Sequence, residues 1–62
     1  MEEYTKQDLE EALRAISSTL HKCEKAFEKL REGTPQHTLA KNRIKALRIS
    51  INLINKALED AV

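Results

Sequence analysis

The sequence contains very few residues that break helices or cross-link chains. Its 62 residues include one glycine, one proline and one cysteine, with no tryptophan, one tyrosine and one phenylalanine. A single cysteine excludes an intramolecular disulfide, and the two histidines do not complete a zinc pattern with it. A chain this short buries only roughly 60% of the surface that its unfolded form exposes. We therefore expect it to gain stability by associating with another chain.

Long apolar runs are also missing. No run approaches the roughly 18–20 residues that a helix needs to cross a bilayer. The acidic start, Met1-Glu2-Glu3, lacks the basic segment of a secretory signal. A lone thiol suits a reducing compartment. We expect a cytoplasmic protein that does not associate with membranes, and a net charge of +1 implies no particular partner.

The glycine and the proline stand close together at mid-chain. Gly33 supplies the left-handed residue that commonly ends a helix. Thr34 is a good N-cap, and Pro35 follows at the first helical position, where its missing N–H costs nothing. Thr5 with Asp8 forms a capping box at the start of the chain. The sequence predicts one all-α domain, 1–62, with helices at about 5–32 and 35–61.

Each predicted helix has an apolar seam with alternating spacings of four and three residues, as in coiled coils. When the chain folds back at Gly33 and Thr34, the two seams face each other. Leu20 then faces Leu47, and each facing pair of positions adds up to 67. We therefore predict an antiparallel helical hairpin. The seams comprise Leu9, Leu13, Ile16, Leu20, Cys23, Phe27 and Leu30, and Ala40, Ile44, Leu47, Ile51, Ile54, Leu58 and Ala61.

Residues 47–53, L-R-I-S-I-N-L, alternate between apolar and polar in the way that is typical of a half-buried strand. A strand here would have no partner strand and no bounding turns. It would also interrupt the seam, to which Leu47 and Ile51 already belong. We therefore predict that this stretch is helical, despite the β preference of its isoleucines.

The second helix has more apolar surface than one hairpin partner can cover. At about 100° per residue, a second line of side chains lies roughly 115° around the helix from the seam. The first helix has only Ala12, Ala15 and Ala26 beside its own seam. We predict that the second line is an interface, with three bulky residues and three small ones that let helices approach closely. Its residues are Leu39, Ala46, Ile49, Ser50, Leu53 and Ala57.

A second copy of the chain is the simplest partner for this line, because two hairpins form a four-helix bundle. The sequence therefore predicts a homodimer. A helix of another protein would fit the same line, and a higher oligomer or a heteromer also remains open.

An alternative function comes from a basic face of the second helix. From Gly33 to Leu58 the chain has no acidic residue. Cations together with amides suit phosphates and base edges, so this face favours RNA or DNA as a partner. Aromatic stacking residues are absent from it, and the acidic first helix can neutralise it across the hairpin. The face comprises Lys41, Lys45, Arg48 and Asn52, with Asn55 beside them.

Residues with chemical potential do not form a catalytic pattern. Ser17 and His21 lie four residues apart on one side of a helix, but a base also needs an orienting group and an oxyanion site. Cys23 lies in the seam, where we expect a buried and inert thiol. We expect His37 to cover the end of the hairpin opposite Leu30. No catalytic, metal or cofactor site is predicted, and we expect no enzyme.

In size and hairpin plan the chain is similar to Rop, the small plasmid RNA-binding protein that dimerises into a four-helix bundle. This likeness concerns architecture alone and transfers no residue. The sequence favours a non-enzymatic helical protein that acts through self-association and protein–protein interaction, as small regulators and adaptors do. The alternative is a nucleic-acid-binding regulator that uses the basic face.

Overall fold

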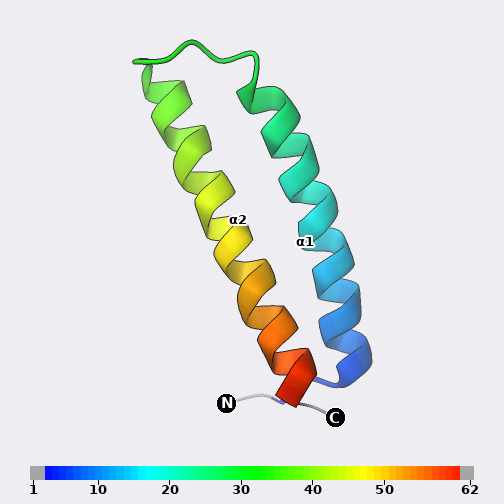
Figure 1. Ribbon diagram of the computed structural model, residues 1–62. Helices are drawn as coiled ribbons and strands as arrows, with labels where there is room; N and C mark the ends of the chain where they lie inside the picture. Colours follow the sequence, from blue (N-terminus) through cyan, green and yellow to red (C-terminus); the bar gives the residue numbers. More distant parts are fainter. Residues whose placement is uncertain (1–2, 61–62) are drawn as a thin grey trace.

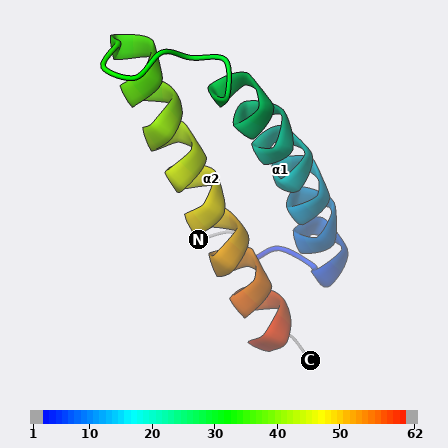
Figure 2. The same ribbon diagram turned by 45° about the horizontal axis from the view of Figure 1, so that its top comes forward.

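The chain folds into two helices that lie side by side and run in opposite directions (Figure 1). A computed structural model describes residues 3–60, with α1 at Lys6–Phe27 and α2 at Pro35–Asp60. The helices also stay alongside each other when the view is tilted by 45° (Figure 2). The molecule is a rod of 43 × 19 × 17 Å. The predicted hairpin is thus confirmed, and residues 47–53 are helical.

The start of α1 has the predicted capping box. Thr5 is extended, with φ −74° and ψ 164°, so its side chain turns back over the first helical turn. The Asp8 N–H donates to Thr5 Oγ1 at 3.0 Å, and the Thr5 N–H donates to Asp8 Oδ2 at 3.0 Å. Two backbone donors that would have no partner within the helix are thereby satisfied.

The end of α1 differs from the prediction. The sequence pattern places it at about residue 32, whereas the helix ends at Phe27. Beyond Glu28, the Lys29 N–H donates to the Ala26 carbonyl at 3.2 Å and the Leu30 N–H donates to the Phe27 carbonyl at 3.0 Å. Bonds to the third preceding residue tighten the last turn and end the α-helix. Residues 28–34 then connect the two helices.

The start of α2 follows the prediction. Gly33 has φ +85°, the only positive φ among the described residues. Thr34 accepts a bond from the His37 N–H at 3.2 Å, as an N-cap does, and its hydroxyl donates to the Arg31 carbonyl at 2.7 Å. Pro35 is the first residue of α2. One threonine side chain therefore links the connection to the new helix.

His37 packs at the turn end of the hairpin, but on a different residue from the one predicted. Its ring lies against the Phe27 ring, with centroids 4.5 Å apart and planes inclined by 32°. The sequence pattern places it opposite Leu30. α1 ends at Phe27, so Leu30 lies beyond the helix, and the aromatic contact of His37 is with the last residue of α1.

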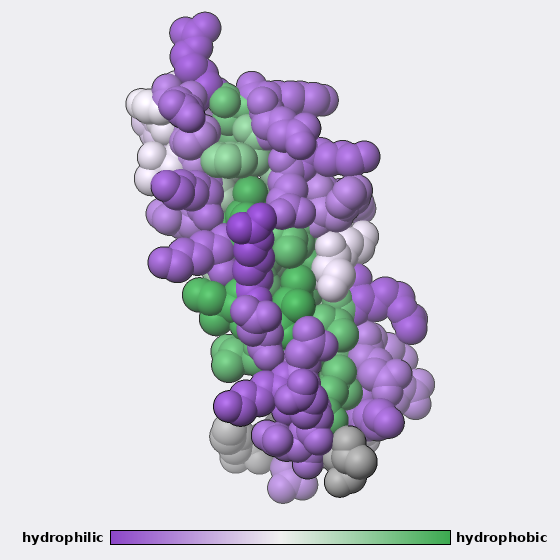
Figure 3. All heavy atoms as spheres, in the orientation of Figure 1, coloured by the Kyte–Doolittle hydropathy of each residue, from purple (hydrophilic) through white to green (hydrophobic). Residues whose placement is uncertain are grey.

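The core of the hairpin is thin. All the predicted seam residues within 3–60 are buried or half-buried, and Ala61 lies outside the described residues. Ile44, 7% exposed, is the one fully buried residue in the part that the structure describes. Cys23 is half-buried rather than buried, which corrects the prediction. Figure 3 shows hydrophobic atoms in a strip between the helices, with hydrophilic side chains on both sides.

Gly33→Ala should lower the free energy of unfolding by about 1–2 kcal/mol, the cost of a left-handed conformation for a residue with a Cβ. No atom lies within 4 Å of the added Cβ, so the cost is conformational rather than steric. Urea unfolding followed by circular dichroism, at one protein concentration, measures it. Glu32→Ala is the matched control, and equal urea midpoints for the two variants would contradict the role of Gly33.

Candidate interaction surfaces

Three large apolar side chains of α2 are exposed. Leu39 is 62% exposed, Ile49 49% and Leu53 63%. Ala46 is also exposed, while Ser50 and Ala57 are half-buried next to the seam. Leu39, Ala46 and Leu53 thus lie on the side of α2 that α1 leaves uncovered. Ile49 also lines the groove of Lys45 and Asn52, two residues of the basic face, so it lies between the two surfaces.

A row of small residues on α1 extends this surface. Leu39 lines an open groove of about 290 Å³ together with Ala26 and Cys23, which shows that the exposed side of α2 and the alanine side of α1 adjoin. Thr19 lies seven residues, or about two helical turns, from both Ala12 and Ala26, so it belongs to the same row, although the sequence pattern did not predict it. We call the combined surface the apolar face. It comprises Ala12, Ala15, Thr19 and Ala26 of α1 and Leu39, Ala46, Ser50, Leu53 and Ala57 of α2, with Ile49 at its edge.

The two hydroxyl groups of the apolar face are already satisfied. The Ser50 hydroxyl donates to the Ala46 carbonyl at 2.9 Å, and the Thr19 hydroxyl donates to the Ala15 carbonyl at 3.0 Å. A buried hydroxyl without a partner costs about 1–3 kcal/mol. Because each hydroxyl bonds within its own helix, the face can lose contact with water without leaving either donor unpaired.

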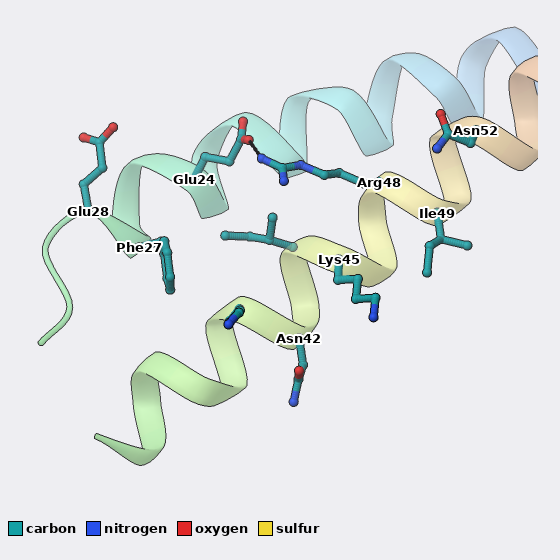
Figure 4. A pocket seen from close by; sticks show the side chains of 10 residues that line it. Glu24, Phe27, Glu28, Asn42, Lys45, Arg48, Ile49 and Asn52 are labelled. Atoms are coloured by element: carbon teal, nitrogen blue, oxygen red, sulfur yellow. Dashed lines mark hydrogen bonds and ion pairs between the residues drawn. The ribbon is translucent and has the colours of Figure 1, made fainter. Parts of the chain in front are cut away.

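The basic face lies on the other side of the seam and is partly neutralised. Arg48 reaches from α2 to α1, where its Nη2 lies 2.5 Å from Glu24 Oε2 (Figure 4). This ion pair shows that a carboxylate of the first helix opposes the basic face, although α1 as a whole has four Lys or Arg and four Asp or Glu and is not acidic. Lys45 projects away from the ion pair, toward solvent. Lys41, Lys45, Arg48 and Asn52 line one open groove of about 650 Å³ with Glu24 and Glu28.

The remaining candidate residues lie apart from these surfaces. Ser17 and His21 are exposed on α1. Across residues 3–60, no three His, Cys, Asp or Glu side chains are grouped so that they could hold a metal ion. Neither α1 nor α2 is long and apolar enough, within the residues described, to cross a membrane.

Comparison of the chain with protein-family models, curated proteins and solved structures gives no match.

The ion pair between Glu24 and Arg48 should contribute about 0.2–1 kcal/mol to the free energy of unfolding, since exposed pairs in water are weak. The two side chains are 39% and 62% exposed. A double-mutant cycle with Glu24→Gln and Arg48→Gln, read by urea unfolding, isolates this coupling. Glu28→Gln provides a control at a neighbouring glutamate. A coupling of zero would show that the contact does not stabilise the hairpin.

Proposed function

We propose that this protein is a non-enzymatic helical hairpin that self-associates through its apolar face and acts by protein–protein interaction. The observation that carries the proposal is the exposure of Leu39, Ile49 and Leu53 on a hairpin in which, across residues 3–60, one residue alone is fully buried. Two such hairpins, packed through their apolar faces, form a four-helix bundle. The product is a small dimeric platform of the kind that regulators and adaptors use.

The energetics favour association. Full burial of a leucine or isoleucine side chain contributes about 1.5–3 kcal/mol relative to full exposure. A dimer buries six of these exposed side chains. That burial is comparable with the roughly 3–5 kcal/mol that a core of this size supplies by itself. The gross gain from covering these side chains, before the cost of bringing two chains together, is therefore large enough to matter for a hairpin of this size.

The size of the face suits a second hairpin. The rod is 43 Å long and 19 Å wide. One whole side of the rod therefore has a projected area of about 800 Å², enough for an interface of standard size if a second hairpin lies along it. Another copy of the chain matches the apolar face in length and width, so it can cover the face along its whole extent.

Ile49→Glu with Leu53→Glu should convert the dimer to monomeric or unfolded chain, because four carboxylates would have to be buried in each dimer. Light scattering measures the molar mass and circular dichroism the helix content. Asn52→Glu with Asn55→Glu adds the same charge at exposed positions on the other side of α2, and that variant should stay dimeric. If the first variant keeps the mass and melting temperature of the parent, the apolar face is not the interface.

A nucleic-acid-binding regulator is the second candidate function. It is favoured by the exposed basic groove, in a helix that has no acidic residue before Glu59. The contact of Arg48 with Glu24 counts against it, because one of the three cations is already paired.

Under this second function, the protein should be retained on RNA or DNA at low salt, and Lys45→Glu with Arg48→Glu should abolish retention. The reason is that cation–phosphate contacts supply most non-specific affinity and weaken with salt. Lys22→Glu with Lys25→Glu makes the same charge change on α1 and should retain binding. The absence of retention for the unaltered protein at low salt would exclude this function.

A further inference from the structure

We infer that the second copy binds antiparallel, with α2 against α2 and the two-fold axis at Ala46, so that the two turns lie at opposite ends of the bundle. This inference rests on the proposed self-association and adds the orientation of the partner. Three features of the apolar face and its surroundings carry it: the spacing of the bulky residues, the charge along the rod, and the ends of α2.

The bulky residues are placed symmetrically about a small one. Leu39 lies seven residues before Ala46, and Leu53 lies seven residues after it. Seven residues are two helical turns, or about 10.5 Å, so all three side chains lie on nearly the same side of α2. A two-fold axis through Ala46, perpendicular to the helix, brings Leu39 of one copy beside the partner's Leu53. The exposed Ala46 lets the two helices approach closely where they meet.

Charge is distributed unevenly along the rod. Residues 20–47, the turn half, contain seven Lys or Arg and three Asp or Glu, a net charge of +4. The other half of the rod consists of residues 3–19 and 48–60. It contains four Lys or Arg and six Asp or Glu, a net charge of −2. An antiparallel copy brings the positive half of each rod to the level of the partner's negative half, although Lys41 and Lys45 lie on the basic face rather than in the interface. Complementary charge of this kind sets the orientation of a partner.

The ends of α2 point to the same arrangement. The first turn of α2 contains no acidic residue and its last turn no basic one, so neither end of the helix dipole is compensated within the helix. With the axis at Ala46, Asp60 of one copy lies near the positive N-terminal end of the partner's α2, which begins at Pro35, although it is also level with the partner's Glu32. On a helical wheel of α2, Asp60 lies within about 20° of Leu53, so it is on the side that faces the partner.

The competing two-fold axis runs along the rod and puts the turns at the same end. In that arrangement Leu39 packs against the partner's Ala26, which fits by size. It also places the two +4 halves side by side, and it brings Asp60 to the start of the partner's α1, where Asp8 and Glu11 already lie. Like charges at the same level of two adjoining rods disfavour an arrangement. Charge therefore selects the antiparallel arrangement.

Disulfide cross-linking distinguishes the two arrangements. In a chain with Cys23→Ala, we expect Ala46→Cys to form a covalent dimer under mild oxidation, because helices packed about 8–10 Å apart bring facing Cα atoms within disulfide range. Ser50→Cys is the matched control on the same face. In the antiparallel dimer its two copies are separated by eight residues, or about 12 Å, along the axis, so it should cross-link at least tenfold more slowly.

Sedimentation of the same reduced variants separates the possible failures. If they are dimeric but Ala46→Cys cross-links no faster than Ser50→Cys, the antiparallel arrangement is wrong and self-association stands. If they and the unaltered chain are monomeric, the proposed self-association fails and this inference fails with it. Circular dichroism checks that each variant is folded.

The salt dependence of dimerisation gives a second measurement that needs no cysteine. In the antiparallel dimer, opposite charges attract across the interface, so raising NaCl should increase the dimer dissociation constant several-fold. Asp60→Asn should reduce that increase. A dissociation constant that falls as NaCl rises indicates that the positive halves lie together, and it would overturn the inference.

Discussion

Two helices can bury only the sides that they turn toward each other, and every other feature of this molecule depends on that limit. α1 has no more bulky apolar side chains than its partner helix can cover, because all of them lie in the seam. α2 has more apolar side chains than α1 can cover, and the hairpin leaves the second set exposed. The seam accordingly accounts for the fold, and the surplus on α2 accounts for the proposed function.

The hairpin is specified by local signals that act together. The capping box at Thr5 and the N-cap at Thr34 fix the starts of the two helices, and the left-handed Gly33 turns the chain in the connection between them. The seam then sets which sides of the helices meet. Since each signal agrees with the others, few alternative arrangements compete with the hairpin. The thinness of the core shows, however, that agreement among local signals does not by itself supply a large buried volume.

Much of this could be predicted from the sequence, because the seam repeats without interruption and the only glycine and proline mark one turn. The end of α1 could not be predicted, because residues 28–32 contain no helix breaker and nothing in the sequence marks the change at Lys29 from hydrogen bonds that span four residues to bonds that span three. The stacking of His37 on Phe27 follows from that early end. The place of Thr19 on the apolar face could not be predicted from hydropathy, because threonine is polar. Its hydroxyl donates to the Ala15 carbonyl of its own helix, so the side chain can lie on an apolar surface.

The mass of the unmodified chain in solution tests the central claim most directly. Sedimentation equilibrium over a wide range of concentration, from micromolar to millimolar, should give twice the chain mass of 7.1 kDa, with a reversible approach to the monomer on dilution. A folded chain that remains at the monomer mass throughout that range would contradict the account, because its exposed leucines would then require no partner.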